Sequence, residues 1–215
     1  MIEQLSVDDV DFFNKWRKNY YVLSEDQHLL LSNQLADKYP HQKHFNEAIF
    51  LKEFQILSDR LGQGISVLEV GGWKGELAST ILSKYPNIES WMDIDICSAT
   101  IINNVCLDPR YLKKIASRFN WFEENRSNPF HVCVCAHTIE HLSWTDLIGL
   151  IDYMDGIPTI IFEAPISQED GELWNNYPGT HILEVGWKTI NSYMQDLGYS
   201  VTQLSEFVYR YERLP

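Results

Sequence analysis

Basic residues are scarce in this sequence. Lys and Arg number 17 against 30 Asp and Glu over 215 residues, which gives a formal net charge of −13 at pH 7. Proteins that bind nucleic acids hold phosphate groups with clustered Lys and Arg, and the sequence lacks such clusters. We therefore expect no nucleic-acid partner and interpret the acidity as a solubility feature. A cationic or neutral small molecule remains compatible as a substrate.

Long apolar runs and the cysteine spacing of metal or redox sites are also missing. No uncharged stretch approaches membrane-spanning length, and the N-terminus has no basic region followed by an apolar run. The four cysteines form no C-x-x-C pair and lie in apolar stretches, at Cys97, Cys106, Cys133 and Cys135. Such cysteines are typical of reduced core residues. We expect a cytoplasmic protein without a membrane partner.

The N-terminal quarter of the chain has helical spacing. Apolar residues recur every four, three and four positions from Phe50 to Leu61, and Tyr39-Pro40 interrupts the region before them. We accordingly divide the chain into an N-terminal helical segment, residues 1–44, and one main domain, residues 45–215.

From residue 65 onward, short apolar runs alternate with helical stretches. The expected strands are Ile65–Val70, Ser90–Ile96, Ile101–Leu107, His131–Ala136, Thr159–Glu163, Ser200–Leu204 and Phe207–Tyr211. Helices between most of them indicate a largely parallel sheet covered on both faces. Only Ser205 and Glu206 separate the last two strands, which is hairpin spacing. The sequence predicts a three-layer α/β sandwich with a mostly parallel seven-stranded sheet and an antiparallel C-terminal hairpin, plus N-terminal helices.

A glycine-rich turn follows the first expected strand. Residues 67–78 read VLEVGGWKGELA, a buried strand that runs into a turn and then a helix. Glycines there let backbone N–H groups and a helix N-terminus approach a ligand without a Cβ in the way. A tight strand-to-helix turn that binds nothing is the alternative interpretation.

This segment resembles motif I of class I (Rossmann-like) S-adenosylmethionine-dependent methyltransferases, in which an acidic residue ends the first strand and a G-x-G-x-G loop follows. Glu69 takes the acidic place, and Trp73 stands where the middle glycine is usual. Small-molecule O-methyltransferases of this class can carry an aromatic residue there. The resemblance implies that the cofactor is S-adenosylmethionine and that the residues binding it include Glu69, Gly71, Gly72, Trp73 and Gly75.

A dinucleotide-dependent reductase also opens with a strand, a glycine turn and a helix. In the short-chain type, its Tyr-x-x-x-Lys pair should lie downstream of the loop. The one such spacing here, Tyr39 to Lys43, lies upstream of it. The order of the motifs therefore disfavours a reductase.

Two carboxylates near the end of the second expected strand extend the resemblance. Asp93 and Asp95 lie about 20 residues after the loop, where related folds place an acid on the ribose hydroxyls. The continuation Asp95-Ile96-Cys97-Ser98 resembles that of the family, so we expect Asp95 to bind the ribose and keep Asp93 in reserve. Asp108 is the expected adenine contact, with a turn role before Pro109 as an equal alternative.

The segment from His137 to Leu142 reads HTIEHL and follows the fourth expected strand. It resembles the Glu-His-Leu region of many class I methyltransferases, which implies that Ala136 and His137 lie beside the methionine part of the cofactor. The spacing of His137, Glu140 and His141 also matches the H-x-x-E-H pattern of zinc peptidases, which requires a helix. Ser143 and Asp146 indicate instead that the next helix starts after His141.

The fifth expected strand ends in Glu163, on the edge of the sheet where ligands bind in open α/β folds. The long loop that follows contains His181, which titrates near neutral pH. We predict His181 or Glu163 as the base that removes a proton from the methyl acceptor, with a structural role as the alternative for each. By analogy with the class, residues 1–44 would cap the substrate pocket.

Three functions follow from these motifs. The favoured one is methyl transfer from S-adenosylmethionine to the oxygen or nitrogen of a small molecule. The second is a regulatory protein that binds the cofactor without turnover. The third is a zinc peptidase using His137, Glu140 and His141; under the first two, we expect no bound metal.

Overall fold

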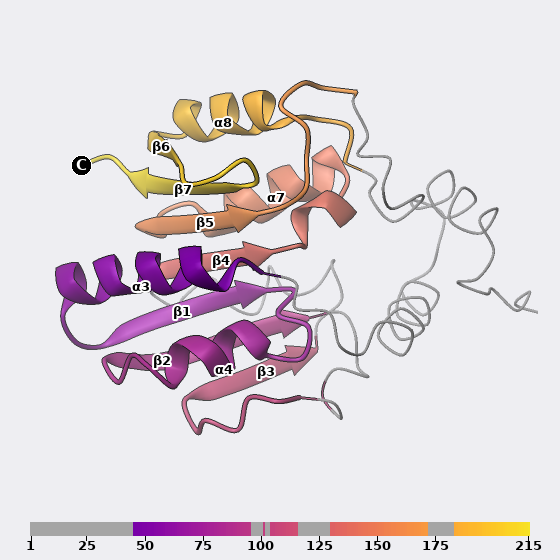
Figure 1. Cartoon of the computed structure of the whole chain (residues 1–215). Coiled ribbons are helices and arrows are strands. Elements are labelled where there is room, and N and C mark those ends of the chain that lie inside the picture. The colour runs from indigo at the N-terminus through magenta and orange to yellow at the C-terminus, as the bar shows by residue number, and fades with distance from the viewer. Residues whose placement is uncertain (1–44, 96–100, 102–103, 116–129, 172–182) are drawn as a thin grey trace, which may run out of the picture.

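The sheet is built from seven strands whose order in space differs from their order in the chain. The computed structural model describes residues 45–95, 101, 104–115, 130–171 and 183–215. Within these ranges the strands are β1 (Ile65–Val70), β2 (Ile88–Asp95), β3 (Tyr111–Ile115), β4 (Val132–Ala136), β5 (Thr159–Glu163), β6 (Tyr199–Gln203) and β7 (Val208–Arg213). Their order is β3-β2-β1-β4-β5-β7-β6 (Figure 1).

Strands β1 to β5 run parallel to one another, whereas β7 lies antiparallel to both β5 and β6. This confirms the predicted mostly parallel sheet that ends in an antiparallel hairpin. The predicted N-terminal helical segment, residues 1–44, lies outside the described residues.

Helices cover both faces of this sheet (Figure 1). On one face, α3 (Glu47–Leu61) and α4 (Glu76–Leu82) pack in a core that includes Val67 of β1. On the other face, α7 (Trp144–Met154) and α8 (Trp187–Asp196) pack in a second core with Leu68. Successive side chains of a strand point to opposite faces, so each strand of the middle of the sheet supplies both cores. The predicted three-layer arrangement is confirmed.

Capping residues in the sequence set the starts of α3 and α7. The Asn46 side chain accepts a hydrogen bond from the Ile49 N–H and so caps the start of α3. The predicted apolar stripe of α3 is buried at Phe50, Phe54 and Leu57. Ser143 caps α7 in the same way, by accepting from the Asp146 N–H, as the sequence predicted.

The prediction of a third strand at Ile101–Leu107 was wrong. Residues 104–107 are not in a strand, and β3 starts only at Tyr111. The apolar side chains that suggested a strand lie on the surface, with Val105 48% and Leu107 90% exposed. β3 lies at the edge of the sheet, and edge strands in natural sheets commonly carry lysines. Its sequence, YLKKI, contains two lysines and therefore lacks the apolar run by which the other strands were predicted.

No helix among the described residues is long and apolar enough to cross a membrane.

Candidate cofactor site

The order of the strands reverses between β1 and β4, which are neighbours although β2 and β3 intervene in the chain. In open α/β sheets, ligands bind beyond the carboxyl ends of the strands at such a reversal. The glycine loop follows β1 at this point, and the turn after β4 lies beside it. Thr138, in that turn, donates a hydrogen bond from its Oγ1 to the Val70 carbonyl at 2.9 Å.

The loop lies too close to its neighbours to carry side chains at Gly71 or Gly72. Gly71 has a φ of 75°, and a Cβ on it would lie 2.1 Å from the Thr138 Oγ1. A Cβ on Gly72 would lie 2.5 Å from the Asp93 carboxylate. The sequence analysis explained these glycines by the close approach of a ligand. The structure adds a reason inside the protein, because a side chain at either position would meet Thr138 or Asp93.

Trp73 replaces the middle glycine of the motif, yet its backbone has a left-handed φ of 50°. Few residues with a Cβ adopt this conformation. The Trp73 N–H donates to the Asp95 Oδ2 at 2.8 Å, and its carbonyl accepts from the Lys113 Nζ. Asp95 and Lys113 therefore hold the Trp73 backbone in a conformation that glycine adopts without strain.

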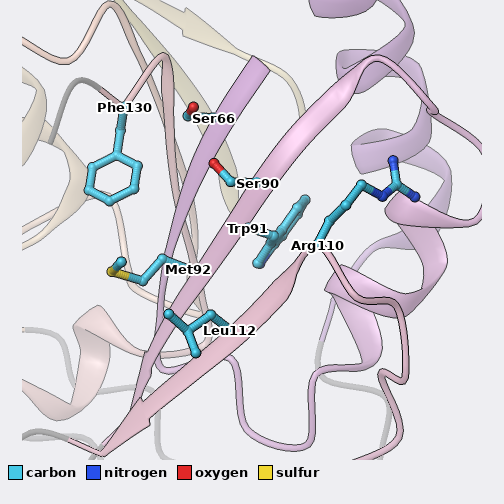
Figure 2. A pocket seen from close by; sticks show the side chains of 7 residues that line it. All are labelled: Ser66, Ser90, Trp91, Met92, Arg110, Leu112 and Phe130. Carbon is cyan, nitrogen blue, oxygen red and sulfur yellow. The ribbon is translucent and has the colours of Figure 1, made fainter. Parts of the chain in front are cut away.

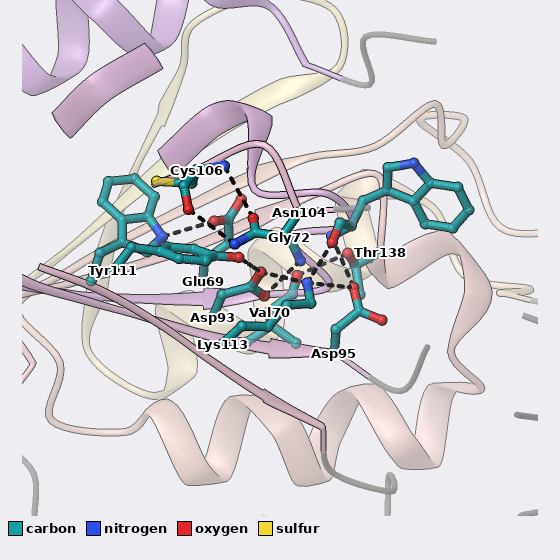
Figure 3. A network of polar contacts seen from close by, with 12 residues as sticks. Glu69, Val70, Gly72, Asp93, Asp95, Asn104, Cys106, Tyr111, Lys113 and Thr138 are labelled. Carbon is teal, nitrogen blue, oxygen red and sulfur yellow. Dashed lines mark hydrogen bonds and ion pairs between the residues drawn. The ribbon is translucent and has the colours of Figure 1, made fainter. Parts of the chain in front are cut away.

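Asp93 and Asp95 occupy different environments, as Figure 3 shows. Asp93 is fully buried and accepts hydrogen bonds from the Gly72 N–H at 3.0 Å, the Tyr111 hydroxyl at 2.5 Å and the Lys113 Nζ at 2.7 Å. Burial, with the neighbouring Asp95, raises the pKa of Asp93 to about 6 although Lys113 opposes the shift. Asp95 is the last residue of β2 and is 6% exposed. The assignment of Asp95 as the ribose ligand stays a prediction.

Glu69 lies deeper than the loop that it precedes. Its Oε2 accepts a hydrogen bond from the Trp91 indole N–H at 2.7 Å, and the residue is only 2% exposed. Burial and the nearby Asp93 hold the pKa of Glu69 well above its usual value. The contact with Trp91 gives Glu69 a structural role beneath the loop, and its predicted contact with the cofactor stays a prediction.

Asp108 does not lie with the other predicted cofactor residues. Its carboxylate accepts hydrogen bonds from the Arg110 side chain at 2.8 and 2.6 Å, and the same guanidinium donates to the carbonyls of Leu82, Tyr85 and Ile88. Ile88 begins β2, so Asp108 lies at the amino ends of the strands, away from the loop. The adenine assignment does not fit this position, and the turn role before Pro109 does.

We expect Asp108→Asn to leave cofactor affinity unchanged and to lower stability. Hydrogen bonds from Arg110 lower the pKa of Asp108 from 3.8 to about 2, so the ionised carboxylate favours the folded state. That contribution is present above about pH 4 and is lost as the pH falls through about 2. Urea unfolding at pH 7 should show a loss of about 1 kcal/mol, which shrinks at pH 3. An equal loss at both pH values would contradict the assignment.

The turn after β4 holds the Glu-His-Leu region. Ala136 ends β4 and pairs with Glu163 of β5, and the His137 N–H donates to the Glu163 carbonyl at 2.7 Å. The His137 Nδ1 lies 3.2 Å from the Oε1 of Glu140, which is 1% exposed. Burial lowers the pKa of His137, but Glu140 outweighs it and the net shift is upward. Ala136 and His137 thus lie at the carboxyl edge beside the glycine loop.

The geometry of this turn does not suit a zinc peptidase. His137 has a φ of 53° and precedes a short 3-10 helix, η1 (Ile139–His141), so the motif does not lie within an α-helix. The next helix begins after Ser143, as predicted. Across the described parts of the chain, no group of three or more His, Cys, Asp or Glu residues could hold a metal ion.

Of the two predicted catalytic residues, the structure describes Glu163. His181 lies outside the described residues. The Glu163 carboxylate accepts hydrogen bonds from the Asn46 N–H, at 3.0 and 2.9 Å, and so faces the start of α3. Burial raises the pKa of Glu163. Glu163 therefore lies at the carboxyl edge of the sheet, bonded to the backbone just before α3, and its catalytic role stays a prediction.

Sequence reasoning missed Thr138, Tyr111 and Lys113. Thr138 packs on Gly71, while Tyr111 and Lys113 reach the second-strand carboxylates from β3. Tyr111 and Lys113 could not be assigned because the third strand was placed too early. The signal that could have found them is the strand period of two, which places Tyr111, Lys113 and Ile115 on one face of a strand.

A cavity of about 190 Å³ lies elsewhere on the sheet (Figure 2). Its lining includes Ser66, Met92, Leu112 and Phe130, on the face opposite α3 and α4. Ser66 is near the amino end of β1, whereas the glycine loop follows its carboxyl end. This cavity is therefore separate from the candidate cofactor site.

No protein-family profile and no curated protein match the sequence. Solved structures do match the fold. Magnesium protoporphyrin IX methyltransferase from Synechocystis, solved with S-adenosylhomocysteine, is 11% identical with a TM-score of 0.57, over 94% of both chains. The chain has the fold of class I methyltransferases. This is the fold that the resemblance of the glycine loop implied.

Two further methyltransferases of this fold are similar to the chain. The N-methyltransferase NodS from Bradyrhizobium japonicum, in complex with S-adenosylhomocysteine, is 15% identical with a TM-score of 0.58, over 86% of this chain and 99% of that one. The small RNA methyltransferase HEN1 is 14% identical with a TM-score of 0.57, over 81% of this chain and 26% of that one. Proteins with this fold therefore act on different acceptors.

Proposed function

We propose that the protein transfers the methyl group of S-adenosylmethionine to the oxygen or nitrogen of a small molecule. The observation that carries this proposal is the meeting of the glycine loop and Asp95 at the strand-order reversal of a methyltransferase fold. Two features support a fit to the cofactor: a glycine turn follows β1 at the reversal, and the Asp95 carboxylate at the end of β2 lies against this turn through the Trp73 N–H.

In this proposal each part of the site has one task. Asp95 accepts hydrogen bonds from the ribose hydroxyls, and the loop from Gly71 to Gly75 lies against the cofactor. Ala136 and His137 border the methionine part. The bound cofactor supplies an electrophilic methyl group on a sulfonium, so the protein mainly aligns the acceptor and removes a proton where the acceptor carries one.

His181 and Glu163 remain the proposed proton acceptors. Glu163 is buried at the carboxyl end of β5, and burial raises its pKa, which makes it a better proton acceptor than an exposed carboxylate. The net charge of −13 supports a small-molecule acceptor over RNA. We propose that residues 1–44 border the acceptor pocket.

Titration calorimetry with S-adenosylhomocysteine tests the cofactor part of the proposal. We expect a saturable, one-to-one binding isotherm. Methyl transfer to a panel of amines, phenols and a small RNA then tests the acceptor. Binding without transfer to any acceptor would favour the regulatory alternative, and no binding would overturn both.

Replacing Asp95 should weaken this binding far more than it weakens the fold. Loss of a charged hydrogen-bond acceptor costs about 1.5–3 kcal/mol, so we expect Asp95→Ala to raise the dissociation constant roughly 10- to 100-fold. Asp95→Asn keeps an oxygen for the Trp73 N–H and separates loss of charge from loss of loop support. Asp108→Asn is the matched control, because Asp108 lies at the opposite edge. Equal affinities of Asp95→Ala and the control would remove Asp95 from the site.

A further inference from the structure

Lys113 is a buried lysine in contact with the glycine loop. It lies in β3, its side chain is 5% exposed, and its Nζ lies 2.7 Å from the Asp93 Oδ2 and 3.7 Å from the Asp95 Oδ2 (Figure 3). The same ammonium group donates a hydrogen bond to the Trp73 carbonyl. One side chain thus joins the edge strand, both second-strand carboxylates and the loop.

The surroundings of Lys113 keep it charged. Burial lowers the pKa of Lys113, but the carboxylates of Asp95 and Asp93 outweigh burial and the net shift is upward. The charged groups that act on it are Asp95 and Asp93 from β2 and Glu69 from β1, and Tyr111 from β3 donates a hydrogen bond to the same Asp93 carboxylate. Hydrogen bonds from a charged ammonium group are shorter and stronger than those between neutral groups. Lys113 therefore holds the Asp93 carboxylate and the Trp73 carbonyl in place.

Trp73 is the residue that needs such support. Its φ of 50° is unfavourable for a residue with a Cβ, and such backbones persist where the surroundings hold them. The Trp73 N–H is held by Asp95 at 2.8 Å and its carbonyl by Lys113. Both polar groups of this peptide backbone are therefore held by one ion pair.

We propose that Lys113 is a positioning residue for the cofactor, which holds the Trp73 backbone in the left-handed conformation that the loop needs for binding. A glycine at the middle of the motif would adopt this positive φ without support. In this chain the hydrogen bond from Lys113 supplies the support that Trp73 needs. In this proposal Lys113 acts through the loop. This inference rests on the proposed function, because the readout is cofactor affinity.

Lys113→Met removes the ammonium group and keeps the apolar stem. We expect the dissociation constant for S-adenosylhomocysteine to rise about tenfold, the equivalent of one lost charge-assisted hydrogen bond. Lys188→Met is the matched control, because Lys188 forms an exposed ion pair with Glu169 and its side chain is 65% exposed. The control should bind like the parent. Unchanged affinity of Lys113→Met would overturn the inference.

A double-mutant cycle with Trp73→Gly separates loop positioning from a general structural role. Glycine adopts a positive φ without support, so we expect Lys113→Met to cost only about twofold in affinity when Trp73→Gly is already present. If Lys113 affected binding independently of Trp73, its loss would cost about tenfold in both backgrounds. Equal losses would therefore overturn the inference. Lys113→Arg, which restores the charge, should recover part of the affinity.

Lys113→Met leaves the Asp93 carboxylate buried without its cation, which threatens folding. The same comparison is therefore made in the Asp93→Asn background, where that charge is absent. Affinity is measured only on samples whose far-ultraviolet circular dichroism matches that of the parent. A parent that does not bind S-adenosylhomocysteine would overturn the proposed function and this inference with it. A parent that binds, with unchanged Lys113→Met, would overturn the inference alone.

Discussion

Replacing Gly71 with valine is expected to destabilise the fold by about 3–5 kcal/mol and to abolish cofactor binding. A β-branched residue at a φ of 75° is a backbone outlier, and the added Cβ would lie 2.1 Å from the Thr138 Oγ1 and 2.8 Å from its Cγ2. Thr138 cannot move away easily, because its hydroxyl is bonded to the Val70 carbonyl. The contact with Thr138 therefore adds a loss of stability to the loss of binding.

Alanine variants separate the two costs. Gly71→Ala and Gly156→Ala both place a Cβ on a backbone of positive φ, but a Cβ on Gly156 would have no atom within 4 Å. We expect Gly71→Ala to lower the melting temperature more than Gly156→Ala and to weaken S-adenosylhomocysteine binding, while Gly156→Ala binds like the parent. Adding Thr138→Ala should recover part of the stability lost in Gly71→Ala. Equal melting temperatures for the two alanine variants would show that Thr138 moves aside without a loss of stability, and would contradict the prediction.

The middle of the sheet could be predicted from the sequence because its strands are buried on both faces. The bounds of β1 and β5 agree with the predicted ones, and every residue of β5 is buried. Such strands appear as unbroken apolar runs between polar segments. β3 gives no such signal, because it lies at the edge of the sheet and carries Lys113 and Lys114. The more apolar segment before it was taken for the strand.

The same difference explains which parts of the site were predicted. The glycine loop and Asp95 lie within one strand-turn-helix unit and the strand after it, so their chemistry is visible in local sequence. The support from Lys113 and Thr138 depends on how β3 pairs with β2 and how the turn after β4 meets the loop. These contacts join residues far apart in the chain. Their partners could be identified only once the sheet order was known.

Asp93→Ala is expected to have the opposite effect to Asp95→Ala, with a larger loss of stability than of cofactor affinity. Asp93 is the hydrogen-bond acceptor for the Gly72 N–H, and it also pairs with the buried Lys113. Removing one partner of a buried ion pair costs about 3–5 kcal/mol, because the other charge remains buried. Urea unfolding at pH 7 measures the loss, and S-adenosylhomocysteine affinity is measured at a temperature where the variant is folded.

The pH dependence of Asp93→Asn gives an independent check on this buried carboxyl group. Its pKa is raised from 3.8 to about 6 in the folded protein, so the folded state binds this proton more tightly than the unfolded state. The stability that this proton gives is fully present below about pH 4 and is lost as the pH rises through about 6. Asparagine does not titrate. The stability of the parent relative to Asp93→Asn should therefore fall between about pH 4 and 7, then stay level. A difference that rises with pH would mean that Lys113 dominates the environment of Asp93, with a lowered pKa.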